Sequence, residues 1–398
     1  MNANIIIEDN ICSNINKEGN MINKDKMPVA LGVAFVWFTT QFGGGFASGA
    51  QLYQYFLAFG IWALITPILA QAMGAIFQWY GLRYARIHGT YDYRSFTDSF
   101  FGKYKFIFSN LYEVVYFVTI CLAPAVAFAT GGTTLSQLTG IPFFICTLII
   151  GVVIFMLTMY GTDFVRKVAS TLSVIIIVGL LVVYVPNIIV QWDAIMNSIS
   201  TLSATPAPIG PALWSFFLYA SFQLASIGLL TQHAEAFKDE TEAKKSMIYG
   251  FLVNASIIFM CTLGMLAIAL NEGIGSDPLP TLTLVRSGVG SVVLTPIISI
   301  LIILGAISTA VNMVAGSVQR FTNALEKRSS PEVNEAKRKM RMTIIALIFT
   351  LLAFSIAQFG LIPLVKQGYG YLGYLTIICI VIPFIVRMIA EATGKVSK

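Results

Sequence analysis

The sequence predicts an all-α membrane protein of about ten transmembrane helices, and three observations carry that prediction. Hydrophobic residues make up 57% of the chain and charged residues only 11%, whereas a soluble domain has about 25% charged residues. The charged residues gather in clusters that are separated by long uncharged runs. Almost all lysines and arginines fall on one side of the membrane when these runs are taken as spans.

Uncharged runs that are long enough to cross a bilayer define the individual spans. A spanning helix needs about 20 mostly apolar residues. The run between Lys26 and Arg83 holds two such helices with a turn at Gly60, and the run 114–162 holds two that meet near Gly140. The predicted spans are 28–57, 60–84, 104–132, 142–160, 167–190, 209–236, 245–271, 289–324, 341–363 and 369–390.

Three connections between the spans are long enough to hold structure of their own. Residues 84–103 are rich in Tyr, Phe, Asp and Arg, which predicts a short amphipathic helix at the inner surface. Residues 191–208 and 272–290 are long outer loops that contain prolines. Loops of this length are either disordered or functional, for example as lids over a binding site.

The basic residues predict the orientation of the chain. With a cytoplasmic N-terminus, only Arg286 and Lys366 of the 25 lysines and arginines lie outside, as the positive-inside rule expects. The net charge of +6 follows from this bias and does not indicate nucleic-acid binding. We therefore expect a multi-pass protein of the bacterial plasma (inner) membrane with both termini cytoplasmic.

The predicted domain organisation is a single transporter domain, residues 27–390, between two cytoplasmic tails. Residues 1–26 are polar and lack the apolar core and cleavage site of a signal peptide, so we expect a disordered tail. Residues 391–398 form the second tail. The ten spans divide into a first repeat (27–192) and a second (207–390), and five helices per repeat invert the second repeat relative to the first.

The first span contains an unusual glycine-rich segment at mid-membrane depth. Gly43, Gly44, Gly45 and Gly49 lie within seven residues, and each glycine costs a helix about 1 kcal/mol relative to alanine. We expect the helix to open here, because unwound backbone inside a membrane is tolerated where it lines a cavity. The alternative interpretation is close helix packing through a small-xxx-small pattern. The predicted solute-binding residues of this segment are Gly43, Gly44, Gly45, Phe46 and Ser48.

The sixth span is also interrupted by polar and small residues. Tyr219, Phe222 and Gln223 lie in the sequence YASFQLASIG near mid-depth. An aromatic ring beside an amide is suited to orient a small ligand, and we expect these residues to shape a solute pocket together with Tyr116 of the third span. The alternative is a polar interface between helices.

Three further features predict ion binding or gating. Ser308 and Thr309 lie deep in the eighth span, where hydroxyl oxygens would suit Na⁺; the alternative is that they bond back to their own helix. Glu113 is the acidic residue that lies well inside a span, and an intramembrane charge is a functional hypothesis by default. We assign coupling or gating roles to Glu113, Gln51 and Asn312.

The sequence shows no signature of an enzyme or of a resident cofactor. It lacks an H-E-x-x-H, a G-x-S-x-G and a P-loop motif, and it has only two histidines. Its five cysteines have no metal-ligand spacing, and four of them lie inside spans. We expect a protein without enzymatic activity, whose partners are a small solute, membrane lipid and a coupling ion, either Na⁺ or H⁺.

The residues of spans one, six and eight together resemble those of a known family. The segment GGGFASG (residues 43–49) resembles the first helix of the amino acid–polyamine–organocation superfamily, and its GFASG core is closest to the YkvI-like amino-acid permease branch. Residues 222–226 are similar to the broken sixth helix of that superfamily. Ser308 and Thr309 are similar to the paired hydroxyls that its sodium-coupled members present from helix eight.

The resemblance implies the LeuT fold, with 5+5 inverted repeats, broken helices one and six, and alternating access. Proton-coupled members often place a lysine in helix five near the site, whereas this sequence has only Lys167, at the inner end of the fifth span. This difference favours Na⁺. The branch usually has an acidic residue two positions after GFASG, where this sequence has Gln51, which argues against carboxylate-based coupling at that position.

We therefore expect a Na⁺-coupled symporter of a small neutral solute such as an amino acid, with residues 272–290 closing the outer vestibule. The alternatives are a proton-coupled carrier and a passive channel. A further alternative is a non-transporting solute sensor on the same scaffold, similar to a germination-receptor subunit. The sequence names neither the solute nor the oligomeric state.

Overall fold

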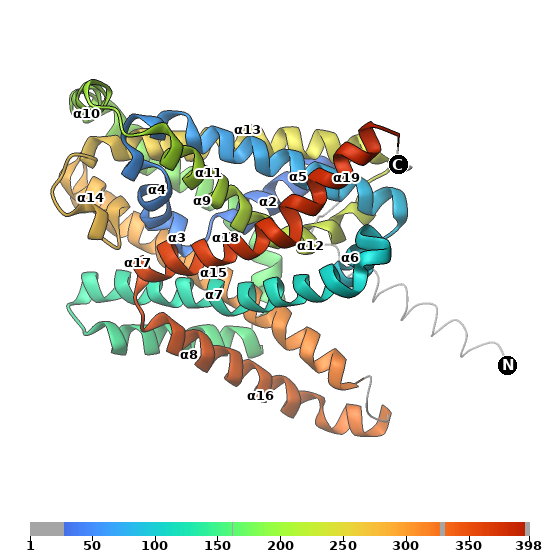
Figure 1. The fold of residues 1–398 in the computed structure, drawn as a ribbon. Helices are drawn as coiled ribbons and strands as arrows, with labels where there is room; N and C mark the ends of the chain where they lie inside the picture. Colours follow the sequence, from blue (N-terminus) through green and yellow to red (C-terminus); the bar gives the residue numbers. More distant parts are fainter. Residues whose placement is uncertain (1–27, 161, 327–330, 395–398) are drawn as a thin grey trace.

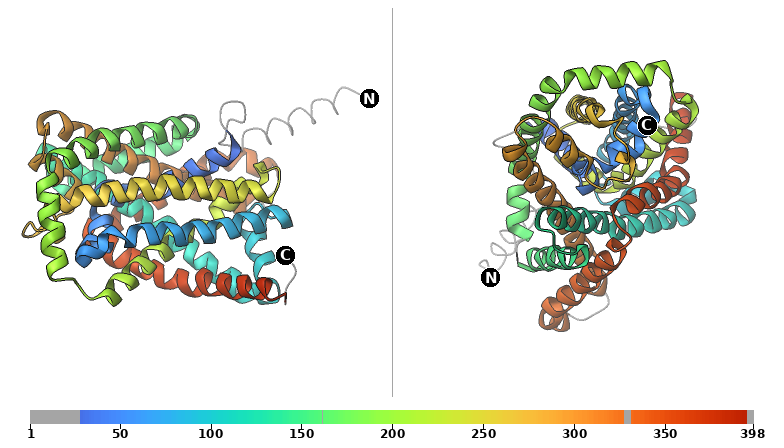
Figure 2. Two further views of the ribbon diagram at one scale, coloured as in Figure 1. Left: turned by 90° about the horizontal axis from the view of Figure 1, so that it is seen from above. Right: turned by 90° about the vertical axis from the view of Figure 1, so that its left-hand side faces the viewer.

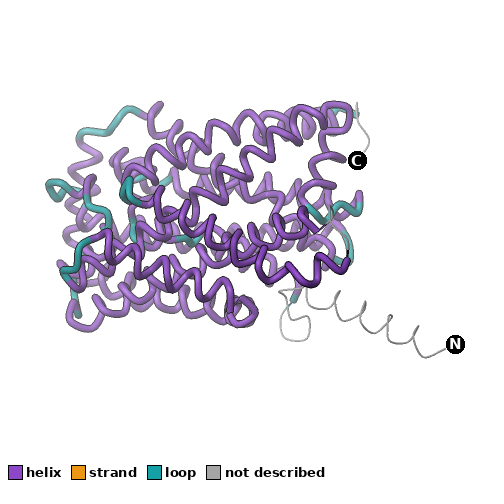
Figure 3. The backbone as a smooth tube through the Cα atoms, turned by 90° about the horizontal axis from the view of Figure 1, so that it is seen from below, coloured by secondary structure: helices purple, strands orange, loops and turns teal. Residues whose placement is uncertain are grey.

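The computed structural model describes residues 28–160, 162–326 and 331–394, and every regular element in these ranges is a helix (Figures 1 and 3). The all-α prediction is therefore confirmed. The predicted tail of residues 1–26 lies outside the described residues, as do residues 395–398 of the second tail.

Most of the described helices have the length and composition of membrane spans. Six are long and apolar enough to cross a membrane, and two bent helix pairs raise that number to eight. Two shorter apolar helices, Val29–Gln41 and Phe143–Met159, fall within the predicted first and fourth spans. Many large apolar side chains are exposed, among them Val292 at 87% and Phe106 at 81%. A surface of this kind is compatible with a lipid environment.

The first half of the chain contains a broken first helix, followed by long helices and short connecting ones. Its elements are α2 (Val29–Gln41), α3 (Gly44–Ala47), α4 (Ala50–Tyr55), η1 (Leu57–Leu64), α5 (Thr66–His88), α6 (Tyr93–Phe101), η2 (Gly102–Tyr104), α7 (Lys105–Thr139), α8 (Phe143–Tyr160), α9 (Thr162–Val190) and α10 (Trp192–Ala204).

The second half begins with an interrupted helix that corresponds to the predicted sixth span. Its elements are α11 (Ile209–Gln223), η3 (Leu224–Ser226), α12 (Ile227–Leu230), η4 (Thr231–Ala236), α13 (Glu240–Met265), η5 (Leu266–Ile268), η6 (Ile274–Ser276), α14 (Pro280–Ser287), α15 (Ser291–Glu326), α16 (Pro331–Ala357), α17 (Leu361–Pro363), η7 (Leu364–Gly368), α18 (Tyr369–Thr376), η8 (Ile377–Val381) and α19 (Ile382–Ala392).

Eight of the helices pack into two groups, and the long α9 packs against α13 of one and α15 of the other. One group contains α2, α5, α11 and α13, and the other contains α7, α8, α15 and α16, which lie in the lower part of Figure 1. The short α3 contacts both α7 and α15 of the second group. The broken first helix therefore joins the two groups at the centre of the molecule.

The two ends of the bundle differ in charge and in covering elements. One end, here called the basic end, carries Arg83, Arg94 and Arg387, and α6 lies there as the predicted amphipathic helix. The opposite end carries Arg286 and Lys366 and is covered by α10 and α14 (Figure 1).

The structure corrects the prediction of a long loop over residues 191–208, because most of it, Trp192–Ala204, forms the helix α10. The axis of α10 bends by 75° from that of α9 and crosses the opposite end of the bundle (Figure 2). On α10 itself, Ile195 and Ser198 are buried, whereas Trp192 and Met196 are exposed. A helix with one buried face lying across the bundle end satisfies its own backbone hydrogen bonds, which a loop at the membrane boundary would leave to water.

Candidate functional site

The first helix breaks at the glycine-rich segment, which confirms the predicted opening. Regular helix ends at Gln41, and the amide of Phe42 donates to the carbonyl oxygen of Phe38 at 2.9 Å. Gly43 is extended (φ −93°, ψ −178°), and α3 begins at Gly44. The break lies at the centre of the molecule, where α2 packs against α13 of the first group and α3 contacts α7 and α15 of the second.

The break frees backbone groups of both polarities. Among the described residues, the carbonyl oxygens of Thr39 and Thr40 accept no backbone hydrogen bond, because the Gly43 amide bonds to Gln41 instead of Thr39 and the Gly44 amide does not bond to Thr40. The amides of Gly44 and Gly45 donate no backbone hydrogen bond. Free carbonyls attract a cation and free amides attract an anionic group, so both kinds of ligand find partners within the seven residues 39–45.

The hydroxyl pair of the eighth span lies against this break. A Cβ atom built on Gly43 would lie 3.6 Å from Oγ1 of Thr309, and one on Gly305 would lie 3.4 Å from the ring of Phe42. The Thr309 hydroxyl donates to the carbonyl oxygen of Gly305 at 2.9 Å, the local bond that the sequence also allowed. Its oxygen lone pairs remain available to accept a cation. Ser308 and Thr309 are both half-buried.

The neighbouring glycines serve close packing as well as the break. A Cβ atom on Gly44 would lie 2.7 Å from Oγ1 of Thr130, and one on Gly45 would lie 2.8 Å from Nε2 of Gln51. Gly49 adopts a positive φ of 85°. The two interpretations of the glycine segment are therefore both correct, at different glycines. Gln51 is buried against the break, and its Oε1 atom has no hydrogen-bond partner among the described residues.

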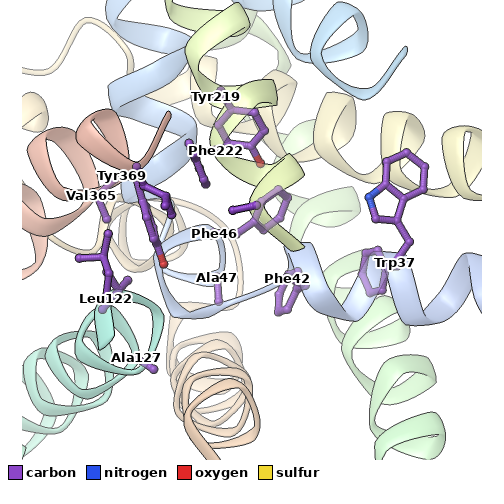
Figure 4. Packing of buried hydrophobic residues seen from close by; sticks show 14 of the residues in the cluster. Trp37, Phe42, Phe46, Ala47, Leu122, Ala127, Tyr219, Phe222, Val365 and Tyr369 are labelled. Atoms are coloured by element: carbon purple, nitrogen blue, oxygen red, sulfur yellow. The ribbon is translucent and has the colours of Figure 1, made fainter. Parts of the chain in front are cut away.

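The predicted residues of the sixth span form part of an aromatic cluster above the break. The rings of Tyr219 and Phe222 lie 5.1 Å apart, and Phe222 stacks on Tyr369 at 4.7 Å. Tyr55 contacts both Tyr219 and Phe222. Figure 4 shows Phe46 between Phe222 and Phe42, at the lower edge of this cluster.

Of the residues in or beside this cluster, Tyr219, Phe222 and Gln223 were named from the sequence, and Tyr55 and Tyr369 were missed. Tyr219 and Phe222 lie together as expected, and Gln223 donates from Nε2 to the Tyr219 hydroxyl at 3.2 Å. Tyr55 and Tyr369 were missed because they come from other spans. The only signal for Tyr369 is its place in the tyrosine- and glycine-rich start of the tenth span.

Hydrogen bonds close the opposite end over the break. The Thr281 amide of α14 donates to the Ser48 carbonyl oxygen at 3.0 Å, and the Tyr55 hydroxyl donates to the Val365 carbonyl oxygen at 3.0 Å. The Ser48 hydroxyl is occupied within its own segment, since it donates to the Gly45 carbonyl oxygen at 3.1 Å. The predicted lid region 272–290 thus contains a helix, α14, that contacts the glycine segment directly.

The sixth span is interrupted at the predicted position but in a different manner from the first. Regular helix ends at Gln223, and the chain tightens into a 3-10 turn from Leu224 to Ser226 without an extended residue. Tyr112 of α7 holds this turn: its hydroxyl donates to the Ala225 carbonyl oxygen at 3.1 Å and accepts from the Gly228 amide at 2.9 Å. No sequence pattern indicated this role for Tyr112.

Glu113 belongs to a charged cluster at the basic end. It forms ion pairs with Arg320 of α15 and, at 3.3 Å, with Arg94 of α6. The Tyr93 hydroxyl donates to Oε1 of Glu113 at 2.9 Å. The guanidinium of Arg320 lies 4.5 Å from the ring centres of both Tyr93 and Tyr116.

The structure places Tyr116 in this charged cluster. The ring of Tyr116 stacks on Tyr93 at 5.1 Å and faces Arg320, whereas the described contacts of Phe222 are with Tyr55, Tyr219 and Tyr369. Tyr116 follows Glu113 by three residues on α7 and shares its face. The attraction between Arg320 and the two rings fixes it in the charged cluster and away from the aromatic one.

One face of α15 links the break to the charged cluster. Thr309, Asn312, Gly316 and Arg320 are spaced by three or four residues and therefore lie on the same face. Asn312 and Gly316 are exposed. Within the described ranges, no group of three or more His, Cys, Asp or Glu side chains is arranged to hold a metal ion.

Comparison with known proteins supports the fold. No protein-family model matches the chain, and no curated protein sequence does. Among solved structures, the chain is similar to a substrate-bound, outward-open Na⁺-coupled sialic acid symporter, with a TM-score of 0.60 and 13% identity over 89% of this chain and 79% of that one. It also matches the manganese transporter of Eremococcus coleocola, with a TM-score of 0.48 and 14% identity over 93% of this chain and 88% of that one. The protein thus has the fold of LeuT-like membrane transporters.

Proposed function

We propose that this protein is a secondary active transporter that carries a small neutral solute, such as an amino acid, together with Na⁺. The observation that carries the proposal is the break in helix one. Free carbonyls at Thr39 and Thr40 and free amides at Gly44 and Gly45 lie within seven residues, where the two helix groups meet. A cation bound there, and likewise a carboxylate, would require the two helix groups to lie close together.

The proposed Na⁺ site combines the hydroxyls of Ser308 and Thr309 with carbonyl oxygens of the break. Thr309 lies beside Gly43, and its hydrogen is already donated to Gly305, so its lone pairs are free to bind a cation. All of these ligands are neutral oxygens, which suits a monovalent ion better than a divalent one. The Na⁺ coupling of the sialic acid symporter that shares the fold supports this assignment.

The proposed solute site lies on the other side of the same backbone. The amides of Gly44 and Gly45 would hold the carboxylate of an amino acid, and Phe46 and Phe222 would contact its side chain. The four members of the aromatic cluster, Tyr55, Tyr219, Phe222 and Tyr369, all have neutral side chains. A neutral side chain would avoid the cost of burying an unpaired charge there.

Alternating access would arise from movement of one helix group against the other. The contacts of Thr281 with Ser48 and of Tyr55 with Val365 close the opposite end, while Asn312 and Gly316 below the break are exposed. This combination corresponds to a state that opens toward the basic end. In the proposed orientation the basic end is cytoplasmic, in the plasma membrane of a bacterium.

We also propose that the chain belongs to the amino acid–polyamine–organocation superfamily, in its YkvI-like permease branch, and that it has no enzymatic activity. The glycine segment 43–49 and the hydroxyl pair at Ser308 and Thr309 support this membership, because both lie where that family places its ligands.

Uptake into proteoliposomes tests the proposed function. Labelled neutral amino acids should accumulate above their external concentration when an inward Na⁺ gradient is imposed, and should not when N-methylglucamine replaces Na⁺. The Ser308→Ala, Thr309→Ala double variant should lose this Na⁺ dependence. Uptake that follows a proton gradient instead would replace Na⁺ with H⁺ as the coupling ion. Saturable binding without any uphill accumulation would contradict transport altogether.

A further inference from the structure

A short segment at the basic end, residues 102–107, is exposed where α6 joins α7 (Figure 1). Its sequence is GKYKFI, and all six residues are exposed. Gly102 starts the segment with a positive φ of 51°, and a Cβ atom built there would meet no other atom within 4 Å. This segment, here called the α6–α7 turn, therefore faces the surroundings of the protein.

The α6–α7 turn combines large apolar side chains with two positive charges. Tyr104, Phe106 and Ile107 are 54%, 81% and 61% exposed. Among the described residues, neither Lys103 nor Lys105 forms an ion pair with a carboxylate. The Lys103 ammonium lies 4.9 Å from the centre of the Tyr104 ring. Exposed apolar groups beside unpaired lysines are typical of the boundary between hydrocarbon and lipid headgroups.

An apolar helix face leads away from the turn along α7. Val114 and Phe117 are 49% and 48% exposed. They follow Phe106 by eight and eleven residues, which places all three side chains on the same face of the helix. A lipid whose headgroup lies at the turn therefore finds an apolar surface for its acyl chains.

Contacts with two other elements hold the turn in place. The rings of Phe101 and Phe108 stack at 5.3 Å across it, and Arg387 of α19 donates to the Phe100 carbonyl oxygen at 2.7 Å. The positions of the two lysines are thus fixed by packed neighbours on both sides. A site that is rigid before binding loses less entropy when a ligand arrives.

We propose that the α6–α7 turn binds the phosphate group of an anionic phospholipid through the ammonium groups of Lys103 and Lys105. Lysine binds phosphate as a point charge. A soluble phosphate would leave Phe106 and Ile107 in water, whereas a lipid covers them. A zwitterionic lipid brings an ammonium group of its own, which the two lysines repel.

Bound lipid would also stabilise the charged cluster, because α6 carries Arg94, which pairs with Glu113 of α7. An anionic lipid that holds the junction of these two helices therefore favours their packed arrangement. The inference concerns the lipid surface alone and does not depend on the proposed solute or coupling ion.

Thermal unfolding of the purified full-length protein in a neutral detergent tests the site, with phosphatidylglycerol or phosphatidylcholine added. Phosphatidylglycerol should raise the unfolding temperature more than phosphatidylcholine does, since a ligand that binds only the folded state stabilises it. In the Lys103→Gln, Lys105→Gln double variant, half-maximal stabilisation should need about thirtyfold more phosphatidylglycerol, because each lysine near an anionic surface contributes about fivefold. Its response to phosphatidylcholine should stay unchanged.

The Lys238→Gln, Lys245→Gln double variant is the matched control. It removes the same charge from exposed positions at the same end, but these lysines lie among Asp239, Glu240 and Glu242, which repel a phosphate. It should keep the phosphatidylglycerol effect. Inorganic phosphate at the same concentrations should not stabilise the protein, which separates a lipid site from a site for a soluble anion.

Three results would overturn the site. The first is equal stabilisation by the two lipids, and the second is an equal loss of the phosphatidylglycerol effect in the two double variants. The third is stabilisation by inorganic phosphate to the same extent as by phosphatidylglycerol. Failure of the proposed transport function would leave all of these measurements unchanged, because none of them requires uptake.

Discussion

Gly43 and Gly44 are adjacent, yet they are glycines for different reasons. Gly43 is extended, a conformation open to any residue, and a Cβ atom there would meet Thr309 at an ordinary contact distance of 3.6 Å. A Cβ atom added to Gly44 would lie only 2.7 Å from Oγ1 of Thr130 and 2.9 Å from Cβ of Thr130. The Thr130 hydroxyl is in turn bonded to the Val126 carbonyl oxygen, which holds the side chain in place.

These contacts predict opposite effects of alanine at the two positions. Gly44→Ala should destabilise the protein by about 1–3 kcal/mol, the usual cost of overpacking. Gly43→Ala should be neutral or stabilise by about 0.4–1 kcal/mol, because it restricts the unfolded chain at an allowed conformation. Thermal unfolding in detergent measures both. Equal destabilisation of the two variants would show that the break itself, and not the contact with Thr130, sets the requirement for glycine.

In the charged cluster, contacts with arginines of other helices determine where Glu113 and Tyr116 lie. Glu113 was expected in a coupling or gating role, and its side chain joins α6, α7 and α15 through Arg94 and Arg320. Tyr116 was expected in the solute pocket and lies instead under Arg320. The coupling roles assigned to Glu113, Gln51 and Asn312 stay predictions.

Among the elements, α14 connects the opposite end to the glycine segment. Its Thr281 amide donates to the Ser48 carbonyl oxygen, and the Thr281 hydroxyl lies 3.0 Å from the Tyr184 hydroxyl of α9. α14 therefore bridges the break of helix one and α9 through one residue. Proline is tolerated in the first turn of a helix, and Thr281 follows Pro280 at the start of α14.

The backbone bond of α14 can therefore be removed without removing the helix. Thr281→Pro deletes the amide that bonds to Ser48, whereas Thr281→Val keeps it and deletes only the hydroxyl. Loss of one hydrogen bond of about 1 kcal/mol should raise the open population at the opposite end about fivefold. Labelling of a Ser48→Cys reporter by an impermeant thiol reagent measures this opening.

The measurement is made in a Cys12→Ser background, because the four cysteines in the described part of the chain, Cys121, Cys146, Cys261 and Cys379, are all buried. The valine variant should label at a rate near that of the reporter alone. If valine accelerates labelling as much as proline does, then the hydroxyl contact with Tyr184 holds α14, and the backbone bond to Ser48 is unimportant.

At the scale of the whole molecule, the broken first helix lies between two packed helix groups. Bonds over the break close the opposite end, and the face of α15 below the break is exposed at Asn312 and Gly316. An exposed asparagine inside a membrane protein is most stable where water reaches it. The structure therefore predicts an aqueous path from the basic end to the break.

An Asn312→Cys variant should react quickly with a hydrophilic, impermeant thiol reagent applied from the basic end. Ile300→Cys is the control, because Ile300 is 57% exposed on the same helix within an apolar surface. A thiol in lipid is poorly ionised and should react slowly. Na⁺ with a transported solute should slow labelling at residue 312 if both favour closure. Equal reactivity of the two variants would mean that Asn312 faces lipid.

The periodic and compositional features of this protein were predictable from the sequence. Each of the ten predicted spans contains helix, since about 20 apolar residues in a bilayer have no other way to satisfy their backbone. The break at Gly43 was predictable because consecutive glycines weaken a helix locally. The amphipathic α6 followed from the composition of residues 84–103, whereas α10 was missed because its apolar face is short and lies between polar residues.

The sequence by itself determined the fold class, the position of the opened helix and the residue types around it, because these depend on local composition and hydropathy. Only the tertiary structure decided which side chains meet: Thr130 beside Gly44, Tyr369 on Phe222, and Arg320 between Tyr93 and Tyr116. These partners lie from about 90 to more than 200 positions apart in the chain. Their contacts follow from how two helix groups pack around a broken helix, and no local pattern encodes that arrangement.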